Sequence, residues 1–487
     1  MEVHISLDGT GDRTDRIYRQ LQDAIIDGRL RPGERLPPTR ELAQRLSVSR
    51  STVSVAYDRL IAEGFLVGRV GAGTFVSGDA EQRPRRRSAP PGAAVRPRAV
   101  WESVRPFPAL SGVGARYDFR VGMPDVSLFP LDVWRRLLNR ELTRTGIGRG
   151  EYVGPSGQPV LTEAIARHIG VSRSVRAAGS DVLITNGAQQ ALDLIARVLI
   201  EPGDTVAVEE PGYPAARQLF RTHGARVVCV PVDAEGLDVT QLPTSARLVY
   251  TTPSHQFPMG MSMSLGRRTA LLEWAEAHGA VIIEDDYDAE FRFAHRPLEP
   301  LQSLDRSGRV LYVGTFAKTM LPALRMGFLV APASLRKALR LAKQLTDWHS
   351  DPTLQRALAR FINDGDLARH IRRANRVYAV RHTHVMNTLE SEAADLLDVV
   401  PSVAGLHVCA RVRESRRLDL APAIAAVEAR GVRVIRLADY CQDPPVPDGL
   451  VLGYGMITED RVVPGLRELI ACLRAASHFP ARQGWGR

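Results

Sequence analysis

A short apolar run leads to a lysine in the stretch Arg309-Val310-Leu311-Tyr312-Val313-Gly314-Thr315-Phe316-Ala317-Lys318-Thr319. The chain has 64 basic residues, yet only three of them are lysines: Lys318, Lys337 and Lys343. The last two lie in an Arg-rich amphipathic stretch, residues 335–345, which is typical of a solvated helix face. Lys318 instead follows what reads as a buried strand, where an unpaired ammonium group is costly. Two interpretations stay open here: a strand-end lysine that reaches solvent, or an amine kept because arginine cannot form a Schiff base.

Similar apolar runs precede this stretch, and longer periodic segments such as 188–200 and 264–278 separate them. The runs are Val182–Thr185, Val206–Val208, Leu248–Tyr250, Ala280–Ile283 and Val310–Val313. This alternation predicts a mostly parallel sheet that helices bury on both faces. Strand-like runs become fewer from about residue 375, which predicts a smaller α+β subdomain. We therefore expect a multidomain chain, with an α+β N-terminal domain ahead of a large α/β domain and this subdomain.

The chain has 487 residues, which indicates more than one domain. Residues 79–98 contain six Arg and four Pro with almost no bulky apolar side chain, so this segment cannot bury a core. The predicted boundaries are an N-terminal domain at 1–78, a linker at 79–112, the large domain with its subdomain at 113–477, and a tail at 478–487.

Composition limits the possible classes of protein. Four scattered cysteines, Cys229, Cys409, Cys441 and Cys472, show neither disulfide nor metal-ligand spacing, so we predict no metal site and a cytoplasmic location. No run approaches the roughly 18 apolar residues of a membrane span, which predicts no membrane partner. The net charge of +10 is compatible with nucleic-acid binding, but an Arg-rich genome composition explains it equally well.

Residues 36–60 show the pattern of two helices joined by a tight turn. Residues 36–46 begin with turn residues and become helical, and Ser47-Val48-Ser49 forms the turn. Ser49 is a suitable N-cap for the second helix, residues 50–60. In a helix-turn-helix the N-terminal end of the second helix meets base edges. The side chains at that end are Arg50, Ser51, Thr52 and Ser54.

A hairpin pattern with glycines at its tip follows at residues 63–76. Turn, second helix and hairpin together resemble the winged helix-turn-helix domain of the GntR family over about residues 14–77. The resemblance implies binding to double-stranded DNA through Arg40, Arg50 and Thr52, with Gly71 and Gly73 in the wing. Some members carry a second Arg where this chain has Ser54, so base readout need not be shared. The alternative is a helical domain that binds another protein.

Three further strand ends carry groups with suitable chemistry for a phosphorylated ring. The turn at 185–189 leads from a strand into a helix, whose free N–H groups suit a phosphate. Residues 284–287, Glu-Asp-Asp-Tyr, place carboxylates where one can pair with a pyridine N–H, although a metal or solvent-facing cluster stays open. Tyr213 follows another strand and can stack on a ring or simply pack in a turn. Arg325 follows Lys318 by seven residues and can pair with phosphate.

The order of these groups at successive strand ends resembles fold type I aminotransferases that use pyridoxal 5'-phosphate (PLP), over about residues 115–477. Open α/β sheets bind ligands at such strand ends. The resemblance implies that Lys318 forms a Schiff base with PLP and that Asp285 pairs with the pyridine nitrogen. It also implies that Tyr287 contacts the ring hydroxyl and Tyr213 stacks on the ring. The groups implied for the phosphate are Ala188, Gln189, Thr315, Arg325 and Tyr152 of the partner subunit.

Residues 252–260 and 284–292 are similar to motifs of the MocR-type regulators within the GntR family. These regulators fuse a winged helix to an aminotransferase-like domain, usually in a domain-swapped homodimer. The resemblance implies that His255 and Gln256 line the pocket, and the alternative is that they order a loop.

One departure argues against an enzyme. Active aminotransferases of this fold usually carry a C-terminal arginine that binds the substrate carboxylate. The matching strand, residues 449–455, has none, and Arg433 and Arg436 belong to an earlier strand. The predicted function is therefore a PLP-dependent, DNA-binding transcription regulator, not an enzyme, that senses PLP, another B6 vitamer or a small amino compound. The alternatives are an active aminotransferase that carries a DNA-binding domain and a regulator whose site no longer binds PLP.

Overall fold

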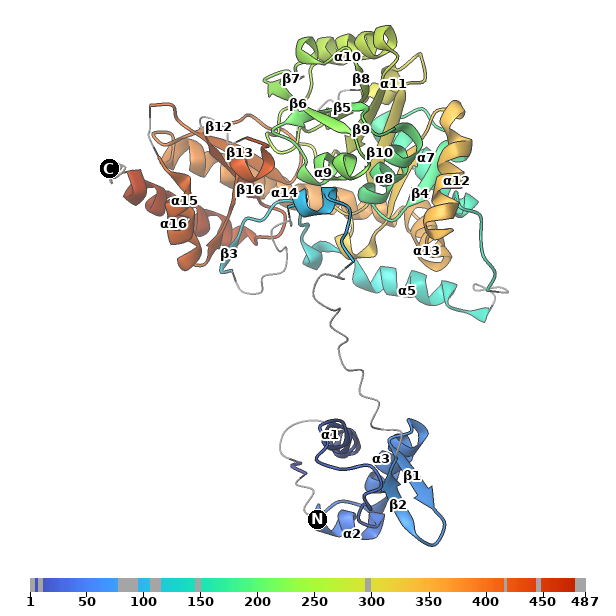
Figure 1. Cartoon of the computed structure of the whole chain (residues 1–487). Helices are drawn as coiled ribbons and strands as arrows, with labels where there is room; N and C mark the ends of the chain where they lie inside the picture. The colour runs from blue at the N-terminus through green and yellow to red at the C-terminus, as the bar shows by residue number, and fades with distance from the viewer. Residues whose placement is uncertain are drawn as a thin grey trace. The chain divides into compact units, whose positions relative to one another are not determined.

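The structure, a computed structural model, describes residues 5–7, 12–77, 95–105, 115–144, 150–293, 299–415, 418–443 and 448–477. The chain divides into two compact units, Met1–Pro97 and Arg98–Arg487 (Figure 1). The predicted tail and residues 79–94 and 106–112 of the predicted linker lie outside the described residues. Among the described residues, no helix is long and apolar enough to cross a membrane.

The N-terminal unit packs three helices against a two-stranded hairpin. Its elements are α1 (Arg13–Ile26), α2 (Thr39–Arg45), α3 (Arg50–Ala62), β1 (Leu66–Arg69) and β2 (Gly73–Val76). Apolar residues of α1 recur at helical spacing and form one buried face, from Ile17 through Leu21 to Ile25. Val53 and Leu60 of α3 pack against this face. The helix pair and the hairpin therefore occur in the predicted order.

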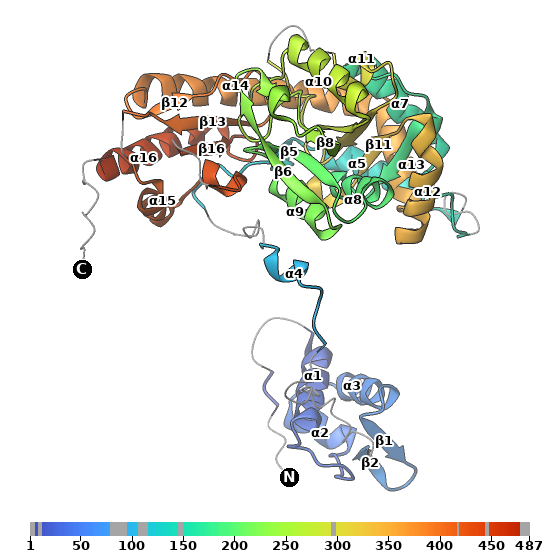
Figure 2. The ribbon, with the colours of Figure 1, turned by 45° about the horizontal axis from the view of Figure 1, so that its top comes forward.

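The second unit is built on an eight-stranded sheet that helices cover (Figure 2). In sheet order its strands are β4 (Val182–Thr185), β11 (Gly327–Val330), β10 (Val310–Thr315), β9 (Val281–Asp286), β8 (Ala246–Thr251), β5 (Thr205–Glu210), β6 (Arg226–Asp233) and β7 (Gly236–Leu237). The five strands from β10 to β6 run parallel to their neighbours. β11 is antiparallel to both β10 and β4, and β7 is antiparallel to β6. The sheet is mostly parallel, as the apolar runs predict, and it includes β6, β7 and β11, which we did not predict.

Alternate residues of the central strands enter different cores, because side chains of a strand point to opposite faces. Leu311 and Val313 pack against α8 (Ala188–Leu199), α9 (Pro214–Thr222) and α12 (Ala333–Asp347). Tyr312 packs on the other face. The helices there are α5 (Leu131–Glu141), α7 (Pro159–Arg173), α10 (Leu265–His278) and α13 (Pro352–Asn363). Short helical turns complete this unit: α4 (Val100–Ser103), α11 (Leu301–Leu304), η2 (Val126–Leu128), η3 (Gly179–Asp181), η4 (Val239–Gln241) and η5 (Pro322–Leu324).

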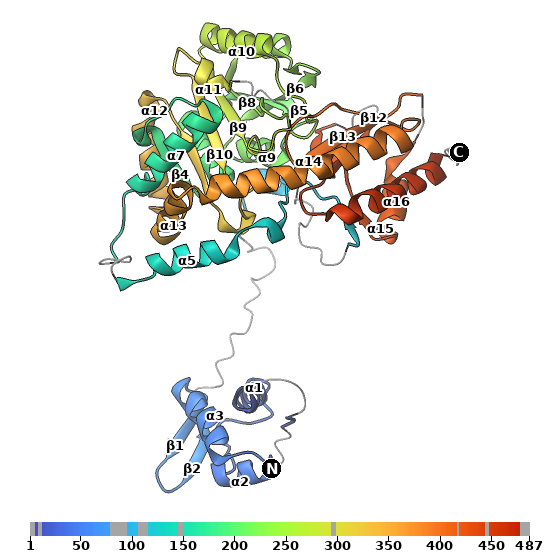
Figure 3. The same cartoon turned by 180° about the vertical axis from the view of Figure 1, so that it is seen from behind.

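A second sheet forms the C-terminal subdomain. Its strand order is β12 (Leu397–Val399), β13 (His407–Val412), β16 (Gly449–Gly453) and β15 (Ile435–Arg436). The covering helices are α14 (Asp366–Glu392), α15 (Leu420–Ala429) and α16 (Glu459–Ser477), with η6 (Leu437–Tyr440) after β15. Figure 3 shows α14 as the long helix that runs from the large sheet to this subdomain. Since α14 begins at Asp366, the subdomain is reached slightly before the predicted residue 375.

An N-terminal segment of the second unit also belongs to the subdomain. β3 (Tyr117–Asp118) pairs in parallel with β14 (Val432–Arg433), and Phe119 is fully buried in the subdomain core. This pairing carries the following residues, including Gly122, towards the end of β10.

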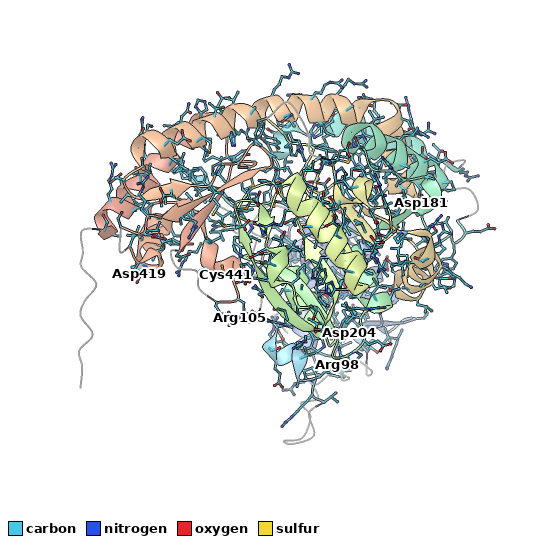
Figure 4. The ribbon with its side chains drawn as sticks, turned by 90° about the horizontal axis from the view of Figure 1, so that it is seen from above. Arg98, Arg105, Asp181, Asp204, Asp419 and Cys441 are labelled. Atoms are coloured by element: carbon cyan, nitrogen blue, oxygen red, sulfur yellow. The ribbon has the colours of Figure 1, made fainter. Side chains whose placement is uncertain are left out.

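Part of the predicted linker is attached to the large unit. A guanidinium nitrogen of Arg98 donates to the carbonyl of Thr222, and the backbone N–H of Arg105 donates to Gln218. Both acceptors belong to α9, so the arginines labelled in Figure 4 hold α4 beside that helix. The predicted domain boundaries otherwise stay predictions.

Candidate functional site

The helix-turn-helix carries one candidate surface. α3 begins directly after Ser49, whose side-chain oxygen accepts a hydrogen bond from the backbone N–H of Thr52 at 3.2 Å. The same oxygen lies 2.7 Å from the hydroxyls of Ser51 and Thr52. This cap fixes the start of the helix and orders the predicted DNA-contacting side chains at its N-terminal end. Ser54 is half-buried one turn further along.

Exposed arginines surround that end of α3. Arg40 and Arg50 are exposed, and within the described residues neither lies within ion-pair distance of a carboxylate. Among the residues that the structure describes, Arg50 reaches the hydroxyl of Thr39, at 3.5 Å. By contrast, Arg45 pairs with Glu41 and Arg59 with Asp15. Positive charge is therefore left free at the surface where a phosphate backbone would lie.

The wing glycines differ in their surroundings. Gly71 lies at the hairpin tip with a φ of 76° and open space where a side chain would be. Gly73 has a φ of 113°, and a Cβ there would stand 2.9 Å from the guanidinium of Arg35. The positive φ favours glycine at this position, and the guanidinium of Arg35 lies across the wing, a contact that sequence reasoning missed.

In the second unit, Lys318 follows β10 and faces a backbone carbonyl. Its Nζ donates to the carbonyl oxygen of Gly122 at 2.6 Å. Burial lowers the pKa of the Lys318 amine, and the nearby carboxylates Asp288 and Asp285 oppose this shift. A lowered pKa increases the fraction of neutral amine, which is the nucleophilic form.

Three consecutive acids on β9 are separated by strand geometry, because successive side chains point to opposite faces. Glu284 accepts the backbone N–H groups of Leu301 and Gln302 at 2.9 Å each. Asp286 pairs with the buried Arg173 at 2.6 Å. Asp285 points the other way, towards the face on which Ile283 packs.

One of the two oxygens of the Asp285 carboxylate has a hydrogen-bond partner. The hydroxyl of Tyr250 donates to its Oδ2 at 2.8 Å, whereas Oδ1 is buried without a hydrogen-bond partner among the described residues. Burial raises the pKa of Asp285 to about 7, against the lowering effect of Tyr250 and the charge of Lys318. A buried, unpartnered carboxylate oxygen fits the N–H of a pyridinium ring. Tyr250 was not predicted, although its place on the strand adjacent to β9 is a usable signal.

An anion cup lies at the start of α8. Gly187 precedes this helix with a φ of 80°, and a Cβ there would stand 3.2 Å from the Arg325 guanidinium. Arg325 donates to the carbonyl of Asn186 at 2.8 Å and so lies across the helix N-terminus. Ala188 and Gln189 are the first two residues of the helix, where N–H groups lack intrahelical acceptors. These groups together can hold a phosphate.

Thr315, the last residue of β10, is buried beside this cup. Its hydroxyl accepts from the backbone N–H of Ala317 at 3.1 Å and lies 3.5 Å from the carbonyl of Met326. The second distance is too long for a strong hydrogen bond, so the hydroxyl hydrogen is available to a ligand.

Two predicted tyrosines meet at one phenylalanine. The ring of Phe257 packs edge-on against Tyr213 at 5.8 Å and against Tyr287 at 5.7 Å between centroids. Burial raises the pKa of Tyr213 to about 12, with Asp285 adding to and Arg325 opposing the shift. Tyr213 therefore lies near both the Asp285 carboxylate and the Arg325 guanidinium. The structure thus brings the carboxylate, the anion cup and the aromatic residues together.

His255 and Gln256, both in the loop 252–260, have different roles. Gln256 donates to the carbonyls of Pro211 and Phe257 and accepts from the backbone N–H of Met259 at 3.0 Å. Gln256 therefore orders the loop, in agreement with the alternative reading. The Nδ1 atom of His255 lies 2.9 Å from the Tyr287 hydroxyl, which places this histidine beside the pocket.

Three buried side chains with metal-type donor atoms, His255, Asp288 and His407, lie within 4.8 Å of one another. Both ring nitrogens of His255 already face hydrogen-bond partners, among them Asp288 and Ser402. We therefore interpret the group as a hydrogen-bonded network. Asp288 was not among the predicted site residues.

Tyr152 lies against residues that follow α12. The residue is 79% exposed, and its ring contacts Trp348 and His349 at 5.2 and 5.9 Å. An aromatic residue this exposed is available to a second copy of the chain.

The β16 strand presents no arginine to the site. Val451 is fully buried there and packs with Val121, Met259 and Cys409. Arg436 lies on β15 and pairs with Asp448 at 2.6 Å. Arg433 lies on β14, next to Asp118 of the paired strand. The wall around Val451 is apolar, and Phe257, which contacts Tyr213 and Tyr287, packs against it.

Two family models match the chain, with residues 13–76 matching the bacterial regulatory proteins of the gntR family and residues 118–441 matching aminotransferase class I and II. The probable rhizopine catabolism regulatory protein MocR of Rhizobium meliloti is 36% identical over 93% of this chain and 92% of its own length. The pyridoxine biosynthesis transcriptional regulator PdxR of Corynebacterium glutamicum is 30% identical over 91% of this chain and 92% of its own. A kynurenine aminotransferase from Pyrococcus horikoshii is 27% identical, with a TM-score of 0.69 over 74% of this chain and 92% of its own. The predicted fold class is thereby confirmed.

Proposed function

Because the chain belongs to the MocR-type branch of the GntR transcription regulators, we propose that its aminotransferase-like unit binds PLP on Lys318 and that occupancy of this site changes DNA binding. The winged helix is the DNA-binding part of such a regulator. A ligand changes DNA affinity when it has different affinities for two arrangements of the protein. PLP bound in the second unit is the candidate for that ligand or for its receptor.

The observation that carries this proposal is the set of complementary groups around Lys318. The unpartnered Oδ1 of Asp285 fits a protonated ring nitrogen, and the Arg325 cup at α8 fits a phosphate. Lys318 provides the amine that condenses with an aldehyde. When bound, PLP would supply an aldehyde for that condensation and a ring that withdraws electrons.

Each side chain then has a role that follows from its position. Asp285 keeps the ring nitrogen protonated, and Tyr250 holds that carboxylate in place. Arg325 neutralises the phosphate together with the first N–H groups of α8. Tyr213 provides an aromatic face beside Asp285. Tyr152 of the partner subunit completes the phosphate site in a homodimer.

The ligand sensed at this site is a B6 vitamer or a small amino compound that displaces Lys318. The apolar wall around Val451 offers no arginine for an α-carboxylate, which disfavours ordinary amino-acid substrates. A regulator of pyridoxine biosynthesis is among the relatives, which supports the vitamer. The same wall disfavours the alternative of an efficient aminotransferase. Repeated turnover of an amino donor to its keto acid by the full chain would favour that alternative.

The test uses the small number of lysines. The full-length protein is incubated with PLP, reduced with borohydride to fix any Schiff base, digested and mapped by mass spectrometry. We expect the label on Lys318 and its loss in Lys318→Ala. Lys337→Ala is the matched control, because Lys337 is exposed on α12. A label on Lys337 or Lys343, or a label that survives Lys318→Ala, would overturn the site.

The regulatory part is tested with operator DNA. Wild type and Lys318→Ala are titrated against DNA from the chain's own promoter region with and without PLP. We expect PLP to change the affinity of wild type and to leave that of Lys318→Ala unchanged. An equal response of both proteins would contradict control through this site.

A further inference from the structure

A buried histidine with partners on both ring nitrogens stands behind Tyr287. The Nδ1 atom of His255 lies 3.1 Å from each carboxylate oxygen of Asp288 and 2.9 Å from the hydroxyl of Tyr287. Its Nε2 atom lies 3.2 Å from the hydroxyl oxygen of Ser402. His255 is 1% exposed, so bulk solvent does not reach these contacts.

The hydrogen atoms of this network can be assigned by counting donors. The single hydrogen of the Ser402 hydroxyl is donated to the carbonyl of Ala404 at 3.0 Å. The Ser402 oxygen can therefore only accept from His255, so Nε2 carries a hydrogen. Nδ1 faces both oxygens of a carboxylate, so it carries a hydrogen too. His255 is then an imidazolium ion paired with Asp288.

This assignment determines what Tyr287 can do. Nδ1 carries one hydrogen, which it shares between the Asp288 carboxylate and the Tyr287 oxygen, so Tyr287 accepts from His255 and keeps its own hydrogen free. A neutral His255 with a bare Nδ1 would instead take that hydrogen. We propose that His255, held as a cation by Asp288 and Ser402, is a positioning residue that reserves the Tyr287 hydrogen for the ring oxygen of the bound cofactor. The inference rests on the proposed function and extends it to residues that contact no ligand.

The backbone at Gly405 and Leu406 packs closely on His255 and Asp288. Gly405 has a φ of 80°, and a Cβ there would stand 2.0 Å from the His255 ring and 2.6 Å from Asp288. The neighbouring N–H of Leu406 donates to Asp288 at 3.3 Å. Chain from the C-terminal subdomain therefore closes directly over the pair, and only glycine permits this approach.

Two other histidines near His255, His407 and His382, have different hydrogen-bond partners from those of His255. Burial lowers the pKa of His407, to about 3, and also lowers that of His382. Each of these histidines bonds a backbone carbonyl through Nε2, at Pro258 and Ser402 respectively. His255 is the one of the three that faces a carboxylate at hydrogen-bond distance. Other charged or titratable groups that interact with Tyr287, His255 or their partners include Glu209, Asp285, Asp286, Glu290, Arg292, Lys318 and Tyr454.

The test compares Asp288→Asn with Tyr287→Phe in the PLP-loaded full chain. In Asp288→Asn we expect His255 to lose its proton, so the net charge of the pair stays at zero. The neutral His255 then accepts the Tyr287 hydrogen. A hydrogen bond to the ring oxygen stabilises its anionic form, and so lowers the pH at which the visible band of the lysine-bound cofactor changes. We expect each variant to raise that pH by about one unit, the usual size for one such interaction.

The double variant separates positioning from a general structural effect. If Asp288 and His255 act through Tyr287, Asp288→Asn adds little to Tyr287→Phe, and the two shifts are far from additive. Additive shifts, or an unchanged midpoint in Asp288→Asn, would overturn the inference. If Asp288→Asn does not fold, Asp288→Ala gives the same decision, because it too removes the carboxylate that holds His255 as a cation. A wild type without any visible band would instead refute PLP binding itself, so the two failures are distinguishable.

Discussion

Tyr250 donates its hydroxyl hydrogen to Oδ2 of Asp285 at 2.8 Å, while Oδ1 of the same carboxylate is buried without a partner in the described part of the chain. An unsatisfied buried acceptor costs about 1–3 kcal/mol. The cost is removed when a ligand N–H reaches Oδ1. Stability is therefore given up in the free protein at the position where a ring nitrogen is proposed to bind.

This relationship predicts a pH-dependent stability. Burial raises the pKa of Asp285 to about 7. In the folded, PLP-free protein the group keeps its proton where the unfolded chain has lost it, so its contribution to stability falls as the pH rises from about 4 to about 7. We expect Asp285→Asn to raise the unfolding temperature of the PLP-free protein at about pH 8 and to change it little at about pH 5. Differential scanning calorimetry of both proteins provides the measurement.

Saturation with PLP serves as the control for this prediction. Asparagine cannot stabilise the ring N–H as a carboxylate does, so PLP should stabilise wild type at about pH 8 far more than the variant. Glu284 and Glu290 also have pKa values raised to about 7 by burial, and their contribution is common to both proteins. A variant that is less stable at both pH values would contradict the account.

Arg325 makes a second prediction, because its guanidinium lies over Gly187 at the start of α8. We expect Arg325→Ala to weaken PLP binding roughly tenfold to a hundredfold, the value of about 1.5–3 kcal/mol for a charged hydrogen bond. Pyridoxal, which lacks the phosphate, should lose little. Arg340→Ala is the control, since Arg340 donates to the Ser180 carbonyl instead. Equal losses for both ligands would show that Arg325 acts on something other than phosphate.

The sequence predicts the sheet and the principal ligand groups because both follow from local patterns. Apolar runs mark the strands that lead to Asp285 and Lys318, and resemblance to known families supplies the roles. The structure adds why Asp285 differs from Glu284 and Asp286: the three side chains alternate between faces of β9. That rule was available from the sequence alone.

Other features depend on contacts between distant residues and had no local signal. The carbonyl of Gly122 lies 196 residues before its partner Lys318 and reaches it because β3 joins the C-terminal subdomain. His255 and Asp288 come together only when their two strand-end loops meet. By contrast, β11 had a local signal that we missed, because its run Phe328-Leu329-Val330 is as apolar as that of β4, which is also four residues long.

DNA binding should depend on arginines that lack acidic partners. We expect Arg40→Ala and Arg50→Ala each to lower operator affinity about tenfold. Removal of a side chain that contacts phosphate should also lower, by about one, the number of counterions released when the protein binds DNA. Arg45→Ala is the matched control, because Arg45 pairs with Glu41 on the same helix as Arg40. An equal loss in Arg45→Ala would place the DNA on a different face.

Tyr152 provides a test of the proposed homodimer, because the residue is 79% exposed and its ring contacts only Trp348 and His349 among the described aromatic rings. If it completes the partner's phosphate site, Tyr152→Ala weakens PLP binding in a dimer of variant chains. A mixed dimer with Lys318→Ala then recovers one intact site, formed by Lys318 of one chain and Tyr152 of the other. We expect mixing after dissociation to restore tight PLP binding to about half of the Tyr152→Ala chains, assuming random pairing. If Tyr152 served its own chain, the mixture would contain no intact site and affinity would stay low.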